Sequence, residues 1–219
     1  MTIQELVTNY PHAYHMAESG TWDSIRRHGL LSTNALLDLF EINGRERQQI
    51  FEQHRPESVT INHPKHGKAV IRDQKPMRDS ALLKCLDKGI TPTNWYQTLN
   101  RNVFFWVSNE RLSRLLGARA YNKKSHCVIT IDTAALLAQH ANRVKLCHIN
   151  SGSTIYTPQP RGADTFRTID DYPFDKWKQK RGVKDAVVEL VIDYSVPDIA
   201  RFVLRVDERR GTNLVKRIL

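Results

Sequence analysis

The hydrophobic pattern along the chain changes repeatedly between the two-residue period of β-strands and the longer period of amphipathic helices. Strand patterns bounded by turn residues predict strands, and one hairpin with a basic tip, in residues 13–17, 59–73, 102–108, 126–132, 144–149, 186–194 and 200–208. Helical spacing predicts helices in residues 22–29, 34–40, 44–53, 78–88, 92–100, 110–122 and 134–140. Because strands and helices are interspersed without regular βαβ alternation, we expect an α+β fold.

Residues 151–181 form the longest stretch without clear periodicity. A loop of that length inside a compact domain is usually functional or disordered. Its aromatic side chains argue against disorder. We therefore expect a functional loop shortly before the strand at 186–194.

The composition is that of a globular protein with an excess of positive charge. The 219 residues carry 33 Lys and Arg against 23 Asp and Glu, which gives a net charge of +10. This length suits one elaborated domain or at most two small ones. No apolar run approaches the roughly 18 residues that a membrane span needs. The first residues lack the basic and apolar regions of a signal peptide, so we expect a cytoplasmic protein with no membrane partner.

The spacing of cysteine and histidine matches no recognised metal or disulfide pattern. The three cysteines are widely separated, and none forms a Cys-x-x-Cys pair. Two pairs of histidines lie three residues apart, but no Asp or Glu completes a known ligand spacing. We expect neither a disulfide framework nor a metal site. Gly-x-Gly-x-x-Gly and P-loop motifs are also absent from the sequence, which removes the commonest nucleotide-binding folds.

Positive charge is unevenly distributed along the chain. Residues 1–40 contain two basic and four acidic side chains, whereas residues 101–124 contain six basic and one acidic. A basic face around the second segment suits an anionic dinucleotide or a nucleic-acid strand. Net charge by itself indicates only affinity for polyanions.

Three polar residues stand in or beside strands that are otherwise apolar. His15 lies in the first strand, where a lone histidine is more often a core or edge residue than a functional group. Arg111 opens a basic helix, where most arginines are solvated. Glu189 is harder to explain, because burying a carboxylate among valine, leucine and isoleucine costs several kcal/mol unless it is paired. It either points out of the sheet or into a cleft, and the long loop before it favours the cleft.

Three blocks of the chain, between Tyr14 and about Val203, resemble ADP-ribosyltransferase-fold proteins, in particular the DarT-type toxins that modify DNA. The first is YHMAESGTWDSIRRHGLLS, a strand ending in Tyr-His, a turn, a helix of the type x-x-Ile-x-x-x-Gly-Leu and a small residue. The second is the aromatic strand NVFFWVS followed by Arg111. The third is AVVELVIDYSVPDIARFVL, a hydrophobic strand containing Glu, then a valine-proline turn and another strand. RNA 2′-phosphotransferases are looser relatives.

The resemblance implies a split, mostly antiparallel β-sandwich core with flanking helices. It implies a single domain over residues 1–219, with a helical and hairpin insertion at about 33–101. The activity that it implies is NAD-dependent transfer of ADP-ribose to a nucleic acid, either DNA or RNA, with NAD as the donor and no metal.

Such chemistry sets physical requirements on the site. Cleavage of the bond to nicotinamide develops positive charge on the ribose, as in glycosidases. The site therefore needs a carboxylate, groups that hold the ribose hydroxyls, an aromatic wall and a cation for the pyrophosphate. By resemblance, Glu189 is the carboxylate and Arg111 holds a phosphate or the acceptor, with Arg114 or Arg119 as substitutes.

The resemblance also implies which residues bind NAD. His15, preceded by Tyr14, matches the histidine that hydrogen-bonds a ribose or the adenosine side. Ser32 matches the small residue after the first helix. Tyr121 matches a ring that stacks on nicotinamide, with Trp106 as a substitute.

The loop at 151–181 stands where this superfamily places its acceptor-recognition loop. Its mixture of cations and rings suits stacked bases and phosphates, and its candidate substrate-binding residues are Arg161, Arg167, Trp177 and Lys178. Three alternatives stay open: a protein acceptor, an RNA 2′-phosphotransferase-like activity and an inactive nucleic-acid-binding module. An active enzyme of the toxin or phage-defence type would also need an antitoxin or inhibitor protein as a partner.

Overall fold

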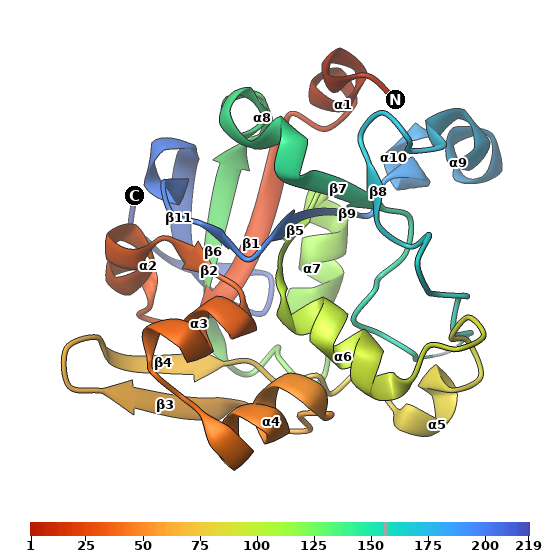
Figure 1. Cartoon of the computed structure of the whole chain (residues 1–219). Helices are drawn as coiled ribbons and strands as arrows, with labels where there is room; N and C mark the ends of the chain where they lie inside the picture. Colours follow the sequence, from red (N-terminus) through yellow and green to blue (C-terminus); the bar gives the residue numbers. More distant parts are fainter. Residues whose placement is uncertain (156) are drawn as a thin grey trace.

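The fold is built on one antiparallel sheet of eight strands. The computed structural model describes residues 1–155 and 157–219, and its strand order is β12-β11-β6-β1-β5-β9-β7-β8 (Figure 1). In that order the strands span Asn213–Arg217, Val203–Arg210, Ser125–Asp132, His12–Glu18, Asn102–Trp106, Glu189–Asp193, Val144–Cys147 and Arg167–Thr168. All neighbouring pairs are antiparallel, so the expected α+β fold with a mostly antiparallel core is confirmed.

Strand β1 is paired unequally along its two edges. Every one of its seven residues is registered with a residue of β6. On the other edge, β1 pairs with β5 at a single position, where Tyr14 lies opposite Trp106. The sheet therefore consists of a β12-β11-β6-β1 half and a β5-β9-β7-β8 half, which separate beyond this pair. The division of the core lies within one continuous sheet.

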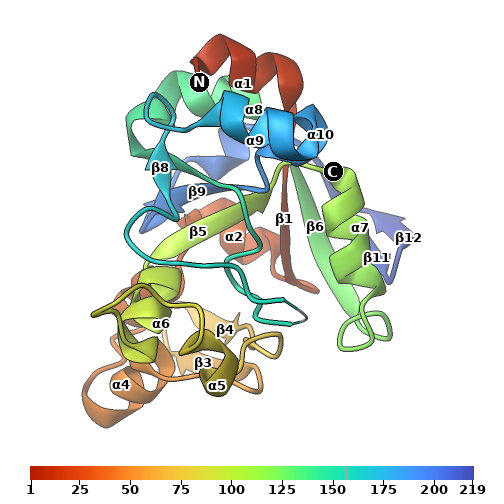
Figure 2. The ribbon, with the colours of Figure 1, turned by 90° about the vertical axis from the view of Figure 1, so that its right-hand side faces the viewer.

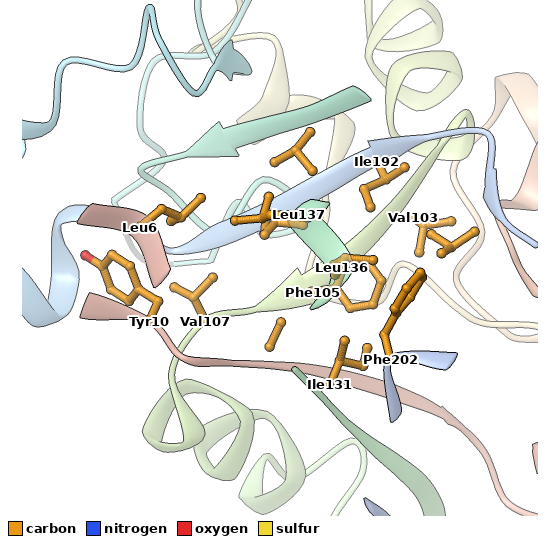
Figure 3. Close-up of a cluster of buried hydrophobic side chains, with 14 of the residues drawn as sticks. Leu6, Tyr10, Val103, Phe105, Val107, Ile131, Leu136, Leu137, Ile192 and Phe202 are labelled. Atoms are coloured by element: carbon orange, nitrogen blue, oxygen red, sulfur yellow. The ribbon is translucent and has the colours of Figure 1, made fainter. Parts of the chain in front are cut away.

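The main hydrophobic core covers one face of this sheet. Helices α1 (Ile3–Asn9) and α8 (Thr133–His140) contribute Leu6 and Leu136, which pack in one cluster with Phe105 of β5 (Figure 3). All three side chains are almost completely buried. At about 25 cal/mol per Å² of apolar surface, burial of these side chains stabilises the packing of α1 and α8 on the sheet.

Helix α7 (Asn109–Gly117) packs on the opposite face. Its Leu112 and Leu116 are fully buried against Met16 of β1 and Val128 of β6. The spacing of these leucines is that of an amphipathic helix. Its exposed side carries Arg114, whereas Arg111 is partly buried and forms an ion pair with Asp185.

Residues 33–101 form a lobe beside the sheet, at the bottom of Figure 1 and Figure 2. The lobe contains α3 (Thr33–Leu39), α4 (Gly44–Glu52), β3 (Val59–His63), β4 (Gly67–Ile71), α5 (Asp79–Leu82) and α6 (Pro92–Asn100). Strands β3 and β4 form the hairpin expected at 59–73. The lobe has two small cores of its own, one around Leu37 and Ile61 and one around Trp95 and Met77.

A short two-stranded sheet connects the first block of the chain to the last. Helix α2 (Trp22–His28) ends at Gly29, after which β2 (Leu30–Leu31) pairs with β10 (Ser195–Val196). Gly29 has a φ of 84°, and a Cβ there would lie 2.5 Å from Cα of Pro197. Only glycine fits this close approach of the backbones.

The segment 151–181 is more ordered than its lack of periodicity predicts. It contains β8 and α9 (Phe174–Arg181), and α10 (Val183–Ala186) follows directly. An isolated bridge joins Arg161 to Leu86 of the lobe. Helix α9 is polar except for Phe174 and Trp177, too few apolar residues to form the longer stripe by which helices are recognised in a sequence.

Other elements differ from the pattern at their ends. The helix expected at 78–88 is one turn long, and that expected at 110–122 ends at Gly117. Helix α1 and strand β12 were not apparent from periodicity, because α1 buries only Leu6 and no residue of β12 is buried. Two 3₁₀ turns, Ala141–Arg143 and Ile199–Arg201, complete the fold. No helix among the described residues has the length and apolar character to cross a membrane.

Candidate functional site

A cavity of about 430 Å³ opens where β1 and β5 separate. Its walls come from both halves of the sheet, from α2 and α3, from β4 of the lobe and from the loop at 150–152. This volume lies in the range of small-molecule sites. Six of the residues expected at the site from the sequence line it: Tyr14, His15, Ser32, Trp106, Tyr121 and Glu189.

Three of these residues form a row across the sheet. Tyr14 of β1 is registered with Trp106 of β5, which is registered with Glu189 of β9. Directly opposed residues of antiparallel strands project from the same face. The carboxylate and the two rings therefore share one face of the sheet, at the pair where its halves meet.

Glu189 is buried and held by the backbone of the loop before α9. Its side chain is only about 4% exposed. The Ser151 N–H donates to both carboxylate oxygens, at 3.2 Å to Oε1 and 3.3 Å to Oε2. Burial raises the pKa of Glu189 to about 7, and the contacts with Ser151 and the charges of Arg111 and Arg161 oppose that rise. A carboxyl with a pKa near 7 is suited to exchanging a proton at neutral pH.

His15 bridges the two halves of the sheet where the backbone ladder stops. Its Nδ1 lies 2.9 Å from the carbonyl oxygen of Phe104 in β5. Burial lowers the pKa of His15 to about 4, which the Phe104 carbonyl opposes and the charge of Arg72 reinforces. A neutral ring in contact with a carbonyl must carry its proton on Nδ1, so Nε2 is a hydrogen-bond acceptor available to a ligand.

Ser32 has a structural role as well as a place in the cavity wall. It is the N-cap of α3, and its hydroxyl oxygen accepts a hydrogen bond from the Ala35 N–H at 3.1 Å. Its own N–H donates to the carbonyl of Tyr194. The hydroxyl is therefore engaged in capping, which stabilises the helix that forms this wall.

Sequence reasoning missed Arg72, which reaches the cavity from the end of the lobe hairpin. Its Nη1 donates to the Met16 carbonyl at 3.3 Å, and its guanidinium lies 5.0 Å from the centre of the Tyr121 ring. The Tyr121 hydroxyl donates to Asp73 Oδ1 at 2.8 Å. Burial lowers the pKa of Arg72, but an arginine stays charged at neutral pH. The residue falls in the strand pattern VIRD, which gives no sign that it turns toward another part of the chain.

The structure does not bring Arg111 into the cavity. Its side chain forms an ion pair with Asp185 of α10. Its substitutes are no closer to the lining: Arg114 is exposed and paired with Glu110, and Arg119 is exposed in the turn after α7. Arg111 therefore does not line the cavity, although its charge favours the ionised form of Glu189, and its role on a phosphate stays a prediction.

The four residues expected to bind the acceptor differ in position and exposure. Arg161, Arg167 and Trp177 line a second hollow of about 300 Å³, and Lys178 is exposed on α9. Arg161 is buried, and its guanidinium donates to the carbonyls of Gln159 and Ser153, so it holds the loop together and does not reach outward. Trp177 stacks on His148 with ring centres 3.9 Å apart, which covers one face of the indole.

Metal ligands are not clustered in the described part of the chain. Among residues 1–155 and 157–219, no group of three His, Cys, Asp or Glu side chains is placed to hold a metal ion. The three cysteines are buried and unpaired.

Comparison with known proteins identifies a family without assigning an activity. No curated protein matches the chain. One family model matches residues 11–203, which include every residue of the row across the sheet and all of the lobe. The chain therefore belongs to DUF7002, a family of unknown function.

Proposed function

We propose that the chain is an NAD-dependent ADP-ribosyltransferase that modifies a nucleic acid. The observation that carries the proposal is the row of Tyr14, Trp106 and Glu189 at the point where the sheet divides. It places a buried carboxyl of raised pKa in the same cavity as two rings and a neutral histidine.

The residues of the cavity suit the parts of an NAD molecule. His15 Nε2 would accept a hydrogen bond from a ribose hydroxyl, and Trp106 or Tyr121 would pack against the nicotinamide ring. Arg72, in place of Arg111, would hold the pyrophosphate, since a guanidinium matches phosphate oxygens in charge and geometry. Bound in this way, NAD supplies an ADP-ribose group through cleavage of its bond to nicotinamide.

Glu189 would act on both sides of the transfer. In its ionised form it accepts a hydrogen bond from a ribose hydroxyl and stabilises positive charge that develops on the sugar. It can also take the proton that the acceptor loses, because its pKa lies near neutrality. The Ser151 N–H holds the carboxylate in place for this work.

The acceptor would approach from the side of the second hollow. Arg167, Trp177 and Lys178 combine charge with an aromatic ring there, which suits phosphates and bases. We place the enzyme in the cytoplasm, among toxins or phage-defence proteins, with an antitoxin or inhibitor protein as its partner. An uncontrolled activity on nucleic acid would otherwise harm the cell that makes it.

The test is transfer from labelled NAD to separate pools of DNA, RNA and protein, followed by nuclease and protease digestion. We expect label in a nuclease-sensitive product. The transfer rate of Glu189→Gln should fall by at least about 10³-fold, since the carboxylate serves as both base and charge stabiliser. Glu189→Gln should keep its NAD affinity within a few fold. Protease-sensitive label would indicate a protein acceptor, and an unchanged rate in Glu189→Gln would contradict the proposal.

A further inference from the structure

A cluster of arginines lies at the β11–β12 edge of the sheet, in the half that does not contain Glu189. Strands β11 and β12 bring Arg205, Arg209 and Arg217 around one carboxylate, that of Asp207. The Nε atoms of the three arginines lie 3.1, 3.7 and 2.7 Å from the Asp207 oxygens, respectively. We call these four residues the arginine cluster.

The arginine cluster has more positive charge than its own carboxylate can balance. Three guanidinium groups face one carboxylate, which leaves two positive charges in excess. The Asp207 side chain is only 2% exposed, whereas those of Arg205 and Arg217 are 39% and 54% exposed. The negative charge is therefore buried beneath a cationic surface.

The hydrogen-bonding groups of the arginine cluster are also incompletely used. Arg217 Nε donates a hydrogen bond to Asp207 Oδ1. The Nε atoms of Arg205 and Arg209 are buried and face Asp207 Oδ2 as ion pairs without hydrogen-bond geometry, so they point inward. Each guanidinium carries five N–H donors and no acceptor. The donors that an added anion could reach are therefore those at the partly exposed guanidinium ends of Arg205 and Arg217.

The register of the sheet places the arginine cluster on the same face as the candidate site. Arg205 is opposite Thr130 of β6, and Thr130 is opposite Tyr14 of β1. Tyr14 begins the row that ends at Glu189. Four steps between neighbouring strands correspond to about 19 Å from Arg205 to Glu189. Helix α7 packs on this face between the two centres, so an extended polyanion that reaches both must pass around α7.

Further cations extend the surface beside the arginine cluster. The turn after α7 carries the exposed Lys123 and Lys124, and Arg210 of β11 fixes this turn by donating to the Lys123 carbonyl at 3.1 Å. The acidic Glu208 follows Asp207 in β11 and is registered with Cys127, so its side chain projects from the other face of the sheet, where it accepts a hydrogen bond from Ser19 at 2.8 Å. Figure 2 shows the turn after α7 beside β11, so these lysines lie next to the hairpin that carries the arginine cluster.

We propose that the arginine cluster, with Lys123 and Lys124, binds the phosphodiester backbone of the nucleic-acid acceptor. Clustered guanidinium groups with unused donors match phosphate oxygens. The β11–β12 hairpin also exposes Leu204, Leu214 and Val215, and a surface for a protein partner would use these residues instead. The excess charge favours the nucleic acid. The proposal rests on the proposed function for the identity of its ligand, but binding can be measured without NAD.

The test is binding of fluorescein-labelled single-stranded DNA, single-stranded RNA and duplex DNA of about 20 nucleotides, in the absence of NAD. We expect Arg205→Gln and Arg217→Gln each to weaken binding by about three- to tenfold. Each should also reduce the slope of log affinity against log salt by roughly one. Arg201→Gln is the matched control, because Arg201 is equally an exposed arginine paired with an aspartate, in this case Asp198. It should bind as the unmodified chain does.

Two further variants keep the outcome interpretable. Lys124→Gln leaves the pairs of Asp207 intact and should weaken binding in the same direction, even where an arginine variant unfolds. Glu189→Gln should bind with unchanged affinity, so a failure of the proposed enzyme activity is distinguishable from a failure of this surface. Absence of binding to all three probes would overturn the proposal, as would an equal loss of affinity in Arg201→Gln and Arg217→Gln. Either result would leave a protein partner as the occupant of the hairpin.

Discussion

The two edges of strand β1 carry out different tasks with the same seven residues. Toward β6, every position is registered in a ladder, and Ile129 opposite His15 is completely buried. Toward β5, β1 forms one registered pair, beyond which the two strands separate. There the side chain of His15 forms a hydrogen bond with the carbonyl of Phe104. Regular pairing stabilises the fold, whereas its interruption leaves room for a cavity and frees polar groups to face it.

This difference accounts for the polar residues that a strand core would not otherwise tolerate. His15 and Glu189 are costly to bury, and both have pKa values displaced by burial. The ladder of β1 with β6 and the hydrophobic core behind it supply the stability that permits this. Substitutions on the β6 side of β1 should therefore lower the stability of the fold, whereas substitutions on the cavity side should alter NAD binding and transfer.

Ile129→Ala on the ladder side should have the largest effect on stability. We expect a loss of about 2–5 kcal/mol in the free energy of unfolding, because removal of a fully buried isoleucine leaves a cavity. Urea unfolding measures this loss. Transfer activity per folded molecule should stay within about twofold of the unmodified chain. A selective loss of activity in the folded variant would erase the distinction between the two edges.

Glu189→Gln on the cavity side should stabilise the fold at alkaline pH. The pKa of Glu189 is about 7 in the folded chain, against 4.5 for the free group, so folding favours the protonated form. The stability that this group contributes is complete below pH 4.5 and is lost as the pH rises through 7, by about 3 kcal/mol in total. The stability difference between the variant and the unmodified chain should therefore grow between pH 5 and pH 8. A pH-independent difference would show that Glu189 ionises normally.

Transfer activity should follow the same ionisation in the opposite direction to stability. The ionised carboxylate is the active form, so the rate should be half-maximal near pH 7 and level off about one pH unit higher. The measurement is the rate at saturating NAD and acceptor between pH 5.5 and 8.5. A rate that falls across this range would contradict the role given to Glu189.

Arg72→Gln and Arg111→Gln test which arginine faces the split. Loss of a charge-assisted contact in the cavity should weaken NAD binding by about 10- to 100-fold in Arg72→Gln. Arg111→Gln should weaken it by less than about threefold, because Arg111 pairs with Asp185 outside the cavity. Titration calorimetry with NAD distinguishes them. The reverse order would restore Arg111 to the role that the sequence first suggested.

His15→Asn should weaken NAD binding at the lower end of the range expected for Arg72→Gln. Asparagine keeps a donor near the position of Nδ1 and removes the acceptor at Nε2, so we expect about tenfold weaker NAD binding with little change in melting temperature. His15→Gln is the matched variant, since its amide extends to the position of Nε2 but leaves the Phe104 carbonyl without its partner. It should lose more stability and less affinity than His15→Asn. Equal behaviour of the two variants would contradict the tautomer assigned to His15.

The sequence predicts the ladder side of β1 more completely than the cavity side. On the ladder side, alternation predicts a strand at 126–132, and β6 spans Ser125–Asp132. On the cavity side, the strand expected at 186–194 is confirmed only over Glu189–Asp193, although Glu189 stands out among its apolar neighbours. Local pattern cannot show that Arg72 crosses from the lobe to contact Met16, because that contact joins segments 56 residues apart. Nor can it show that Arg111 pairs with Asp185, since helical spacing defines the exposed face of α7 but not the partner that α10 provides.

The most direct measurement is a crystal structure of Glu189→Gln in complex with NAD. The account predicts density for NAD in the split between β1 and β5, with a ribose hydroxyl within 3.2 Å of His15 Nε2 and the pyrophosphate beside Arg72. Nicotinamide should lie against Trp106 or Tyr121, with its ribose next to residue 189. NAD bound elsewhere on the molecule, or no binding at millimolar concentration by a folded protein, would contradict the claim that the interrupted edge of β1 is the donor site.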